Sequence, residues 1–329
     1  MKKRVLALLT ALCVLLACGG CAPLLARDVV QVARCVPGSL LHNHHLEKAH
    51  VVDEFHIYYS LQGKDALQYP QDSTGDGVPD VVKDIASQLQ AAKYLYTSLL
   101  GLRPPLQQKI YTQARQINIY LLTLPKGHGL AFDRVAAETM SDGATLPCGL
   151  KIVLNAARRP ARNVTPAHEL FHLYQYGYAV FKQKWYLEGM ARWMENAFRP
   201  AEQSILPLAA PPVCENYFSR GYGAASFWAS YAQQSFAATI LPDHALVYRY
   251  IDGSPVFKIQ VLPGGAMLAP FFQQLALNSE GISREMKLAN TRWSEKQQRD
   301  GRFNNQICQA LAATAKREGN KKPAARVLD

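Results

Sequence analysis

Two histidines and a glutamate stand at a spacing that suits a catalytic metal ion. In the segment HELFH, His168 and His172 are four residues apart. On a helix, both side chains lie on nearly the same face and can reach one ion. Glu169 is rotated from that face by about a quarter turn, where a general base can take a proton from a metal-bound water. We therefore expect a helix here, with Asn163 or Thr165 at its start.

The segment WYLEGMARWME supplies a third ligand. Glu188 follows His172 by sixteen residues, which allows a turn near Gly177 and a second helix running back along the first. Two histidines and one glutamate leave the fourth tetrahedral position of a zinc ion to water, as in catalytic sites. Glu195 lies seven residues further on. It either accepts a hydrogen bond from a ligand histidine or forms a surface salt bridge with Arg192.

The amino terminus has the layout of an export signal. A basic start precedes the apolar run VLALLTALCVLLA, which is too short to span a bilayer comfortably. The residues before Cys18 resemble the lipobox of bacterial lipoproteins, which predicts a signal peptide over 1–17 and a lipid on Cys18. Cys21 is the competing lipidation site, and an ordinary secretory signal is the alternative. The predicted location is the cell envelope, anchored by lipid at the outer membrane or periplasmic face, or else secreted.

Composition and charge narrow the class of protein. The chain of 329 residues is 49% hydrophobic and 19% charged, enough for one large core or two packed subdomains. The net charge is +11, but the signal and the tail over 316–329 carry three net positive charges each, which leaves +5 for the body. A mildly basic, exported body suits contact with an anionic envelope surface, and we expect no nucleic-acid partner.

Four cysteines of the predicted mature body favour disulfides over metal binding. Export implies an oxidising compartment, and these cysteines form no CxxC pair. Two disulfides are expected, and three pairings remain open. The cysteines are Cys35, Cys148, Cys214 and Cys308.

The pattern along the chain predicts a tether over 18–50, a catalytic domain over 51–315 and a basic, disordered tail over 316–329. Within the domain we expect a strand of about ten residues in VVDEFHIYYSLQG, strands at QINIYLLTL and KIVLNA, and a helix that ends before Gly101. Beyond Phe198 the chain is predicted to be largely helical. The tether ends in a histidine-dense stretch, which is a solvated linker or a weak metal site. Its histidines are His42, His44, His45 and His50.

An aspartate-rich loop precedes the predicted helix. Its oxygen-bearing side chains alternate as in the first nine positions of a calcium loop, with Gly77 at the tight turn. The twelfth position is Lys83 in place of glutamate, so the loop is not an EF-hand. A bound calcium ion and a plain aspartate-capped turn both remain open. The candidate calcium ligands are Asp72, Thr74, Asp76 and Asp80.

HELFHLYQ and WYLEGMARWME together resemble the gluzincin branch of zinc peptidases. The tryptophan before Glu188 and the Glu-Gly-x-Ala that follows are similar to the aminopeptidases of that branch, although the spacing from His172 is three residues shorter. A closer resemblance, over residues 53–230, is to exported, poorly characterised bacterial metalloproteases, which combine the zinc motifs with a loop and helix like STGDGVPDVVKDIA. The resemblance implies His168, His172 and Glu188 as zinc ligands and Glu169 as base.

The resemblance also implies a fold and a further catalytic residue. The expected fold is α+β, zincin-like and of two subdomains: a small twisted sheet and a helical C-terminal half, with the active-site helix between them. A tyrosine is expected to donate a hydrogen bond to the oxyanion. Tyr222 is the first choice and Tyr217 the second, and simple core packing is the alternative for both.

These patterns predict an exported, lipid-anchored zinc metalloendopeptidase that acts on peptides or proteins. Zinc lowers the pKa of its bound water, and Glu169 takes the proton and returns it to the leaving amine. The strand at KIVLNA is expected to bind an extended substrate by edge pairing. Two alternatives stay open. One is a non-catalytic surface or assembly lipoprotein with a structural zinc site, and the other is a zinc hydrolase of cell-wall peptides.

Overall fold

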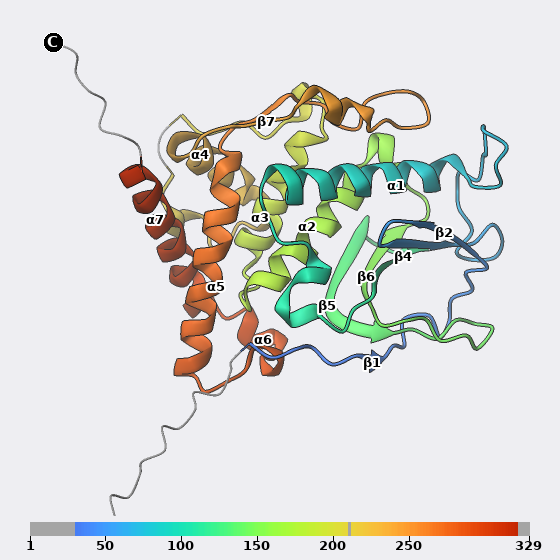
Figure 1. The fold of residues 1–329 in the computed structure, drawn as a ribbon, viewed down its shortest axis with the longest axis horizontal. Helices are drawn as coiled ribbons and strands as arrows, with labels where there is room; N and C mark the ends of the chain where they lie inside the picture. The colour runs from blue at the N-terminus through green and yellow to red at the C-terminus, as the bar shows by residue number, and fades with distance from the viewer. Residues whose placement is uncertain (1–29, 210–211, 322–329) are drawn as a thin grey trace, which may run out of the picture.

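The computed structural model describes residues 30–209 and 212–321. Its fold is α+β, with a mixed sheet toward one end, helices of the C-terminal half toward the other, and helices α2 and α3 between them (Figure 1). The predicted signal peptide, Cys18 and Cys21 lie outside the described residues. No helix among the described residues is both long and apolar enough to cross a membrane.

Six strands form the main sheet, in the order β1-β5-β6-β4-β3-β2. Strands β3, β4 and β6 are parallel to one another, while β2 and β5 run antiparallel to their neighbours β3 and β6. Strand β1 pairs with β5 through two residues only. The strands are β1 (Val36–Pro37), β2 (Lys48–Val52), β3 (Phe55–Tyr59), β4 (Gln116–Leu122), β5 (Gly129–Ala137) and β6 (Gly149–Asn155).

Two expectations about the strands are corrected. VVDEFHIYYSLQG was expected to be one strand, but it belongs to a hairpin in which β2 and β3 meet at a turn with Asp53 at φ 50°. Strand β5 was not expected, because its exposed and buried positions do not alternate regularly and its register shifts between Phe132 and Ala136. Strand β6 contains most of the segment KIVLNA and pairs with β5 on one side and with β4 on the other. This segment is therefore not at an edge of the sheet.

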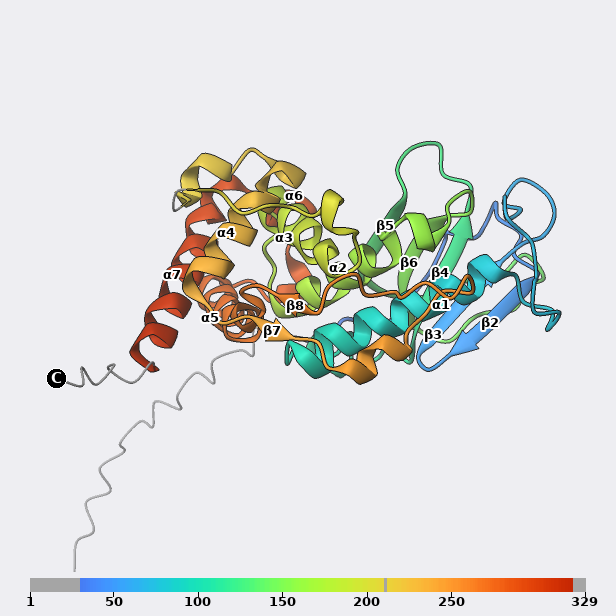
Figure 2. The same ribbon diagram turned by 90° about the horizontal axis from the view of Figure 1, so that it is seen from above.

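Helices α1 and α2 contact the sheet, while α4, α5 and α7 lie toward the other end of the molecule (Figure 2). Helix α1 follows the aspartate-rich loop as expected and continues as a π-helical turn over Tyr94–Leu99. A small hairpin of β7 (Thr239–Ile240) and β8 (Val261–Leu262) lies beyond α4. The α-helices are α1 (Asp80–Lys93), α2 (Thr165–Tyr178), α3 (Lys184–Met194), α4 (Ala225–Ser235), α5 (Leu268–Glu285), α6 (Glu295–Gln298) and α7 (Asn304–Lys321).

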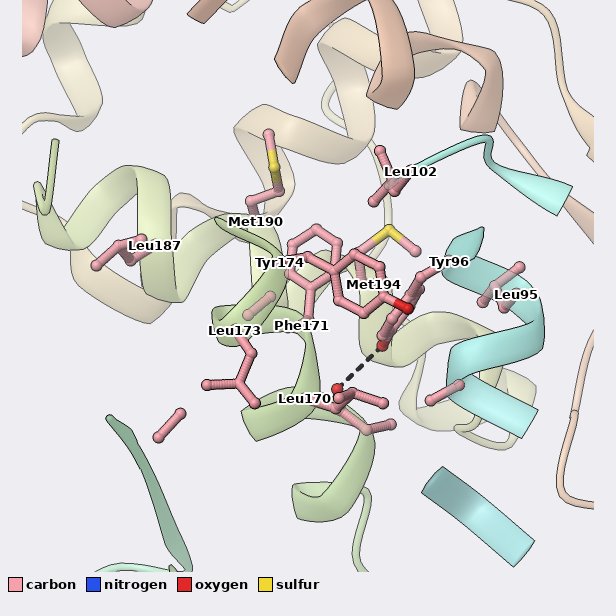
Figure 3. Packing of buried hydrophobic residues seen from close by; sticks show 14 of the residues in the cluster. Leu95, Tyr96, Leu102, Leu170, Phe171, Leu173, Tyr174, Leu187, Met190 and Met194 are labelled. Atoms are coloured by element: carbon pink, nitrogen blue, oxygen red, sulfur yellow. Dashed lines mark hydrogen bonds between the residues drawn. The ribbon is translucent and has the colours of Figure 1, made fainter. Parts of the chain in front are cut away.

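Helix α2 lies in the middle of one large hydrophobic core that includes residues from the sheet and from the C-terminal helices. Phe171 and Tyr174 on α2 pack edge to face against Tyr96, whose hydroxyl donates a hydrogen bond to the carbonyl of Ala167 at 3.1 Å (Figure 3). All four residues are at most 1% exposed. Such close packing leaves α2 little freedom to move, so it is a rigid support for polar side chains on its other face.

The predicted tether over 18–50 is too long, because its later residues belong to the fold. Strand β1 and part of β2 lie within it, and the backbone amide of Leu40 donates to the buried Glu138 at 2.8 Å. A disulfide joins Cys35 to Cys148, and a second joins Cys214 to Cys308, which settles the pairing. At the other end, helix α7 continues to Lys321, so the predicted disordered tail also begins too early.

The aspartate-rich loop is held together by a lysine. The ammonium of Lys83 lies 3.2 Å from Asp72 Oδ1 and 2.9 Å from Asp76 Oδ1, and it also donates to Thr74. Asp80 is more distant, at 3.8 Å. These oxygens therefore already surround a cation that belongs to the chain. Asp72 also accepts the backbone amides of Gly75 and Gly77, at 3.0 and 2.7 Å, as in the aspartate-capped turn that the sequence also allowed, although the start of α1 itself has no side-chain cap. We propose no calcium ion at this loop.

The histidine-dense stretch does not converge on one point. His44 Nδ1 lies 2.8 Å from Asp65 Oδ2, whereas His45 Nδ1 lies 2.5 Å from the hydroxyl of Ser141. Different partners therefore hold these two rings apart from one another. The described residues of this stretch form no group of three side chains that could hold one metal ion.

Asp84 on α1 makes the stability of the fold depend on pH. Burial, together with Asp252 and Asp80, raises its pKa from an ordinary value of 3.8 to about 6, although its oxygen accepts the amide of Ile251 at 2.7 Å. The folded state therefore binds this proton more tightly than the unfolded state. The charged form costs stability as pH rises from about 4 through 6, and the cost persists above that.

We expect Asp84→Asn to stabilise the protein at pH 7.5 relative to wild type, and to do so much less at pH 4. The gain should be about 1 kcal/mol, since solvent screens this partly exposed group. Urea unfolding of both proteins at the two pH values measures it. A difference between variant and wild type that does not change with pH would contradict the assignment.

Candidate metal centre

The residues around Asn163 and Pro166 fix where α2 begins. Asn163 precedes the helix, and its side-chain oxygen accepts a hydrogen bond from the backbone amide of Thr165 at 2.8 Å. Pro166 occupies the first turn, where its missing amide hydrogen leaves no bond unmade. Pro166 therefore acts as expected, and Asn163 binds the first amide of the helix, although the residue directly before the helix is Val164, which has no side-chain cap. His168 and His172 follow one turn apart and share a face of the helix, next to the side from which Phe171 enters the hydrophobic core.

Three side-chain atoms from α2 and α3 converge on one point. His168 Nε2 lies 3.1 Å from His172 Nε2, and Glu188 Oε2 lies 3.4 Å and 3.6 Å from these two nitrogens. Ligands about 2.0–2.1 Å from a tetrahedral zinc ion stand about 3.3 Å apart. Among the described residues, this is the only group of three or more His, Cys, Asp or Glu side chains close enough to share a metal ion.

Hydrogen bonds fix which atom of each histidine faces this point. His168 Nδ1 lies 2.7 Å from Glu195 Oε1, and His172 Nδ1 lies 2.7 Å from Gln175 Oε1. Carboxylate and amide oxygens only accept, so each Nδ1 carries the proton and donates it. The Gln175 amide cannot be reversed, because its nitrogen donates to the carbonyls of Tyr186 and Leu187 at 3.4 and 3.3 Å. When both rings are neutral, their Nε2 atoms therefore present lone pairs to each other.

This arrangement favours a positive charge at its centre. Glu188 Oε2 is buried and has no hydrogen-bond partner, and it lies beside the two Nε2 atoms. Burial lowers the pKa of His168, but contacts with the Glu188 and Glu195 carboxylates outweigh burial and raise this pKa to about 10. Without a metal ion, a proton on this ring therefore supplies the positive charge. Although burial opposes its charge, Glu188 has its pKa lowered by the two histidines. The same negative field favours a metal ion, so the residues present fit the predicted zinc ligands.

Glu195 makes both contacts that the sequence allowed, with a ligand histidine and with Arg192, although it is buried and the ion pair is not a surface one. One oxygen accepts the proton of His168, and the other, Oε2, lies 2.7 Å from Arg192 Nη1. Arg199 binds the same Oε2 through Nε at 2.7 Å. Burial alone would raise the pKa of Glu195, but His168 and the two arginines lower it. Arg199 was not expected from the sequence, nor was Gln175. The only signals were the helical spacings from Glu195 and from His172.

Close helix packing places Tyr222 beside the centre. A side chain on Gly189 would come within 2.8 Å of Ala224 Cβ and 3.2 Å of the carbonyl of Gly221. The residue after Glu188 must therefore be glycine for the segment carrying Tyr222 to approach α3. The Tyr222 ring lies 5.9 Å from that of His168. Burial and the neighbouring Glu188 raise its pKa, so the hydroxyl keeps its proton.

Tyr217, the second-ranked tyrosine, packs elsewhere. Its ring lies 5.1 Å from the ring of Phe227 on α4, and Arg220 lies over its other side at 5.5 Å. These contacts agree with the simple packing role that was the alternative for both tyrosines. Of the two, the structure brings only Tyr222 to the metal-binding group.

Glu169 lies between the centre and strand β5. Its side chain is 7% exposed, and burial raises its pKa despite the neighbouring His168 and His172. The backbone amide of Ala131 on β5 donates a hydrogen bond to its carboxylate. A side chain on Gly129 would come within 2.9 Å of Glu169 Oε1. The unexpected strand β5 therefore fixes the position of the predicted base.

The centre opens into a cavity of about 950 Å³, within the range of small-molecule and peptide sites. His168, Glu169 and Tyr222 all line it, together with Arg192 and Arg199. Of the three metal-binding side chains, His168 lines this cavity, which leaves room beside it for water and for substrate. Closed structural zinc sites have no such opening.

No protein-family model matches this chain, and neither does any curated protein or solved structure. Its function is therefore inferred from the geometry of the site itself.

We expect Gln175→Met to weaken zinc binding about 10- to 100-fold. Methionine has a similar size but cannot accept the Nδ1 proton of His172, so the ring loses its fixed orientation. Competition with a zinc chelator measures the change in Kd. Gln203→Met is the matched control, because Gln203 lines the same cavity and its side chain bonds neither histidine. Equal affinities of the two variants would contradict the role of Gln175.

Proposed function

We propose that this chain is a zinc-dependent peptidase of the gluzincin type. The observation that carries the proposal is the convergence of His168 Nε2, His172 Nε2 and Glu188 Oε2 on one point, with the Nδ1 atom of each histidine held by a hydrogen-bond acceptor. The position of α2 between the sheet and the helical half agrees with the zincin-like, two-subdomain arrangement expected from the sequence. The proposed location, a lipid-anchored protein of the cell envelope, rests on the amino-terminal sequence alone.

The residues around the centre suit hydrolysis of an amide bond. A bound zinc ion would supply an acidified water and polarise the substrate carbonyl. Glu169 lies beside the histidines and is held by β5, so it is placed to accept a proton and to return it to the leaving amine. Tyr222 keeps its proton and can donate a hydrogen bond to the oxygen that becomes negative in the transition state. Glu195 and Gln175 hold the two histidines in the required tautomer.

Strand β5 offers a place for an extended substrate. Its first residues, 129–132, pair with β6 on one side, while β1 pairs only with Ala136 and Ala137. Within the described part of the chain, the other side of residues 129–132 has no strand partner. This edge lies beside Glu169, so a peptide paired with it would pass the base. We therefore assign substrate pairing to β5 in place of the KIVLNA segment.

Replacing Glu169 by Gln tests the chemistry. The variant should keep one zinc ion per chain but lose at least a factor of about 100 in hydrolysis, because an amide cannot accept the proton. Turnover of an unfolded, fluorescently labelled casein and the zinc content are measured on the same samples. Glu202→Gln, an exposed change near the cavity, should keep full activity. Undiminished turnover by zinc-loaded Glu169→Gln would rule out this mechanism.

Replacing Tyr222 by Phe tests the oxyanion contact. We expect kcat to fall about 10- to 100-fold with little change in KM or zinc content, because the hydroxyl acts mainly in the transition state. Tyr217 does not line the cavity, so Tyr217→Phe should leave kcat unchanged. If both variants behave alike, Tyr222 has no catalytic role.

A further inference from the structure

Two guanidinium groups beside the metal-binding residues share one carboxylate. Arg192 and Arg199 both bind Glu195 Oε2, while Glu195 Oε1 is taken by His168. Among the described residues, neither arginine has an ion pair with any other carboxylate. Glu195 is 5% exposed and can balance only one of the two positive charges. The cluster therefore keeps a net charge of about +1 when His168 is neutral.

This excess charge faces the cavity. Both arginines line it, and their side chains remain 33% and 17% exposed. Glu169 is the only other acidic residue in the cavity wall, and its carboxylate is held by β5 next to the histidines. No anionic side chain of the described wall is thus left to neutralise the second arginine. An anionic group of a ligand would meet a positive surface here.

The two arginines have different roles in this cluster. Arg199 directs both Nε and Nη2 at Glu195, at 2.7 and 2.5 Å, and so holds that carboxylate in place. Arg192 uses Nη1 alone. Its Nε and Nη2 are not engaged by Glu195, and a guanidinium edge with two free N–H groups fits a carboxylate in bidentate fashion. Arg192 is also the more exposed of the pair.

We propose that Arg192, supported by Arg199, forms a carboxylate-binding subsite of the cavity. The inference rests on the proposed function and deepens it: the preferred substrates carry a carboxylate close to the bond that is cleaved, on the Glu195 side of the centre. That carboxylate is either an acidic side chain or the free carboxyl terminus of the peptide. The competing view is that the arginines serve only to neutralise Glu195, in which case acidic and neutral ligands bind alike.

Peptide hydroxamates are suitable probes, because the hydroxamate binds the metal and the peptide reaches into the cavity. One pair of probes differs only in a Glu or Gln side chain next to the hydroxamate. A second pair differs only in a free or amidated carboxyl terminus. Titration calorimetry on the zinc-loaded protein gives four Kd values. We expect the acidic member of at least one pair to bind at least about fivefold more tightly than its neutral partner, and the pair affected identifies the source of the carboxylate.

Variants test whether Arg192 causes this preference. Arg192→Gln should bring the ratio of the two Kd values close to one, while Glu195 remains bound to Arg199. Arg192→Lys keeps the charge but not the bidentate geometry, so it should retain part of the ratio. Arg284→Gln makes the same change of net charge on α5, outside the cavity, and should retain all of it. Zinc content is measured for each variant.

Equal binding of acidic and neutral probes to the wild-type protein would overturn the subsite while leaving the metal centre intact. A preference that persists in Arg192→Gln would likewise overturn the role of Arg192. If none of the four hydroxamates binds the zinc-loaded protein, the proposed peptidase fails, and the subsite fails with it.

Discussion

The structure depends on three lone-pair atoms held face to face in a buried place. When both imidazoles are neutral, their Nε2 atoms, 3.1 Å apart, are both acceptors and repel one another, and the partnerless Glu188 Oε2 adds a negative charge. Such a group is costly unless a cation balances it. The chain nevertheless fixes each member: Glu195 and Gln175 hold the histidines, and α3 brings Glu188 to them. Side chains that are held in such an unfavourable arrangement by specific partners are expected at a functional site.

Packing elsewhere in the molecule supplies the rigidity that this group needs. Aromatic contacts with Tyr96 restrain helix α2. Gly189 lets the segment that carries Tyr222 approach α3. Strand β5 lies so close to α2 that position 129 tolerates no side chain. The hydrophobic core that joins the sheet to the C-terminal helices therefore also sets the distances between base, ligands and tyrosine. The contacts that stabilise the fold are thus also the contacts that position the site residues.

Local spacing made the central residues predictable, and long-range contacts made the others unpredictable. The helix period places His168 and His172 on one face, and a short connection returns Glu188 to them. Strand β5 has an irregular pattern of exposure and a bulge, so periodicity does not reveal it. Lys83 occupies the aspartate loop because α1 turns its side chain back over the loop, a three-dimensional effect that side-chain alternation cannot express. Arg199 depends in the same way on how the chain folds after α3.

The central claim is that His168, His172 and Glu188 bind one metal ion together. X-ray absorption at the zinc edge of the purified, zinc-loaded protein tests it most directly. The account predicts one zinc ion per chain with only nitrogen and oxygen ligands at about 2.0–2.1 Å, including two imidazoles, and loss of this signal in Glu188→Ala. Sulfur ligands, or an unchanged spectrum in Glu188→Ala, would contradict it.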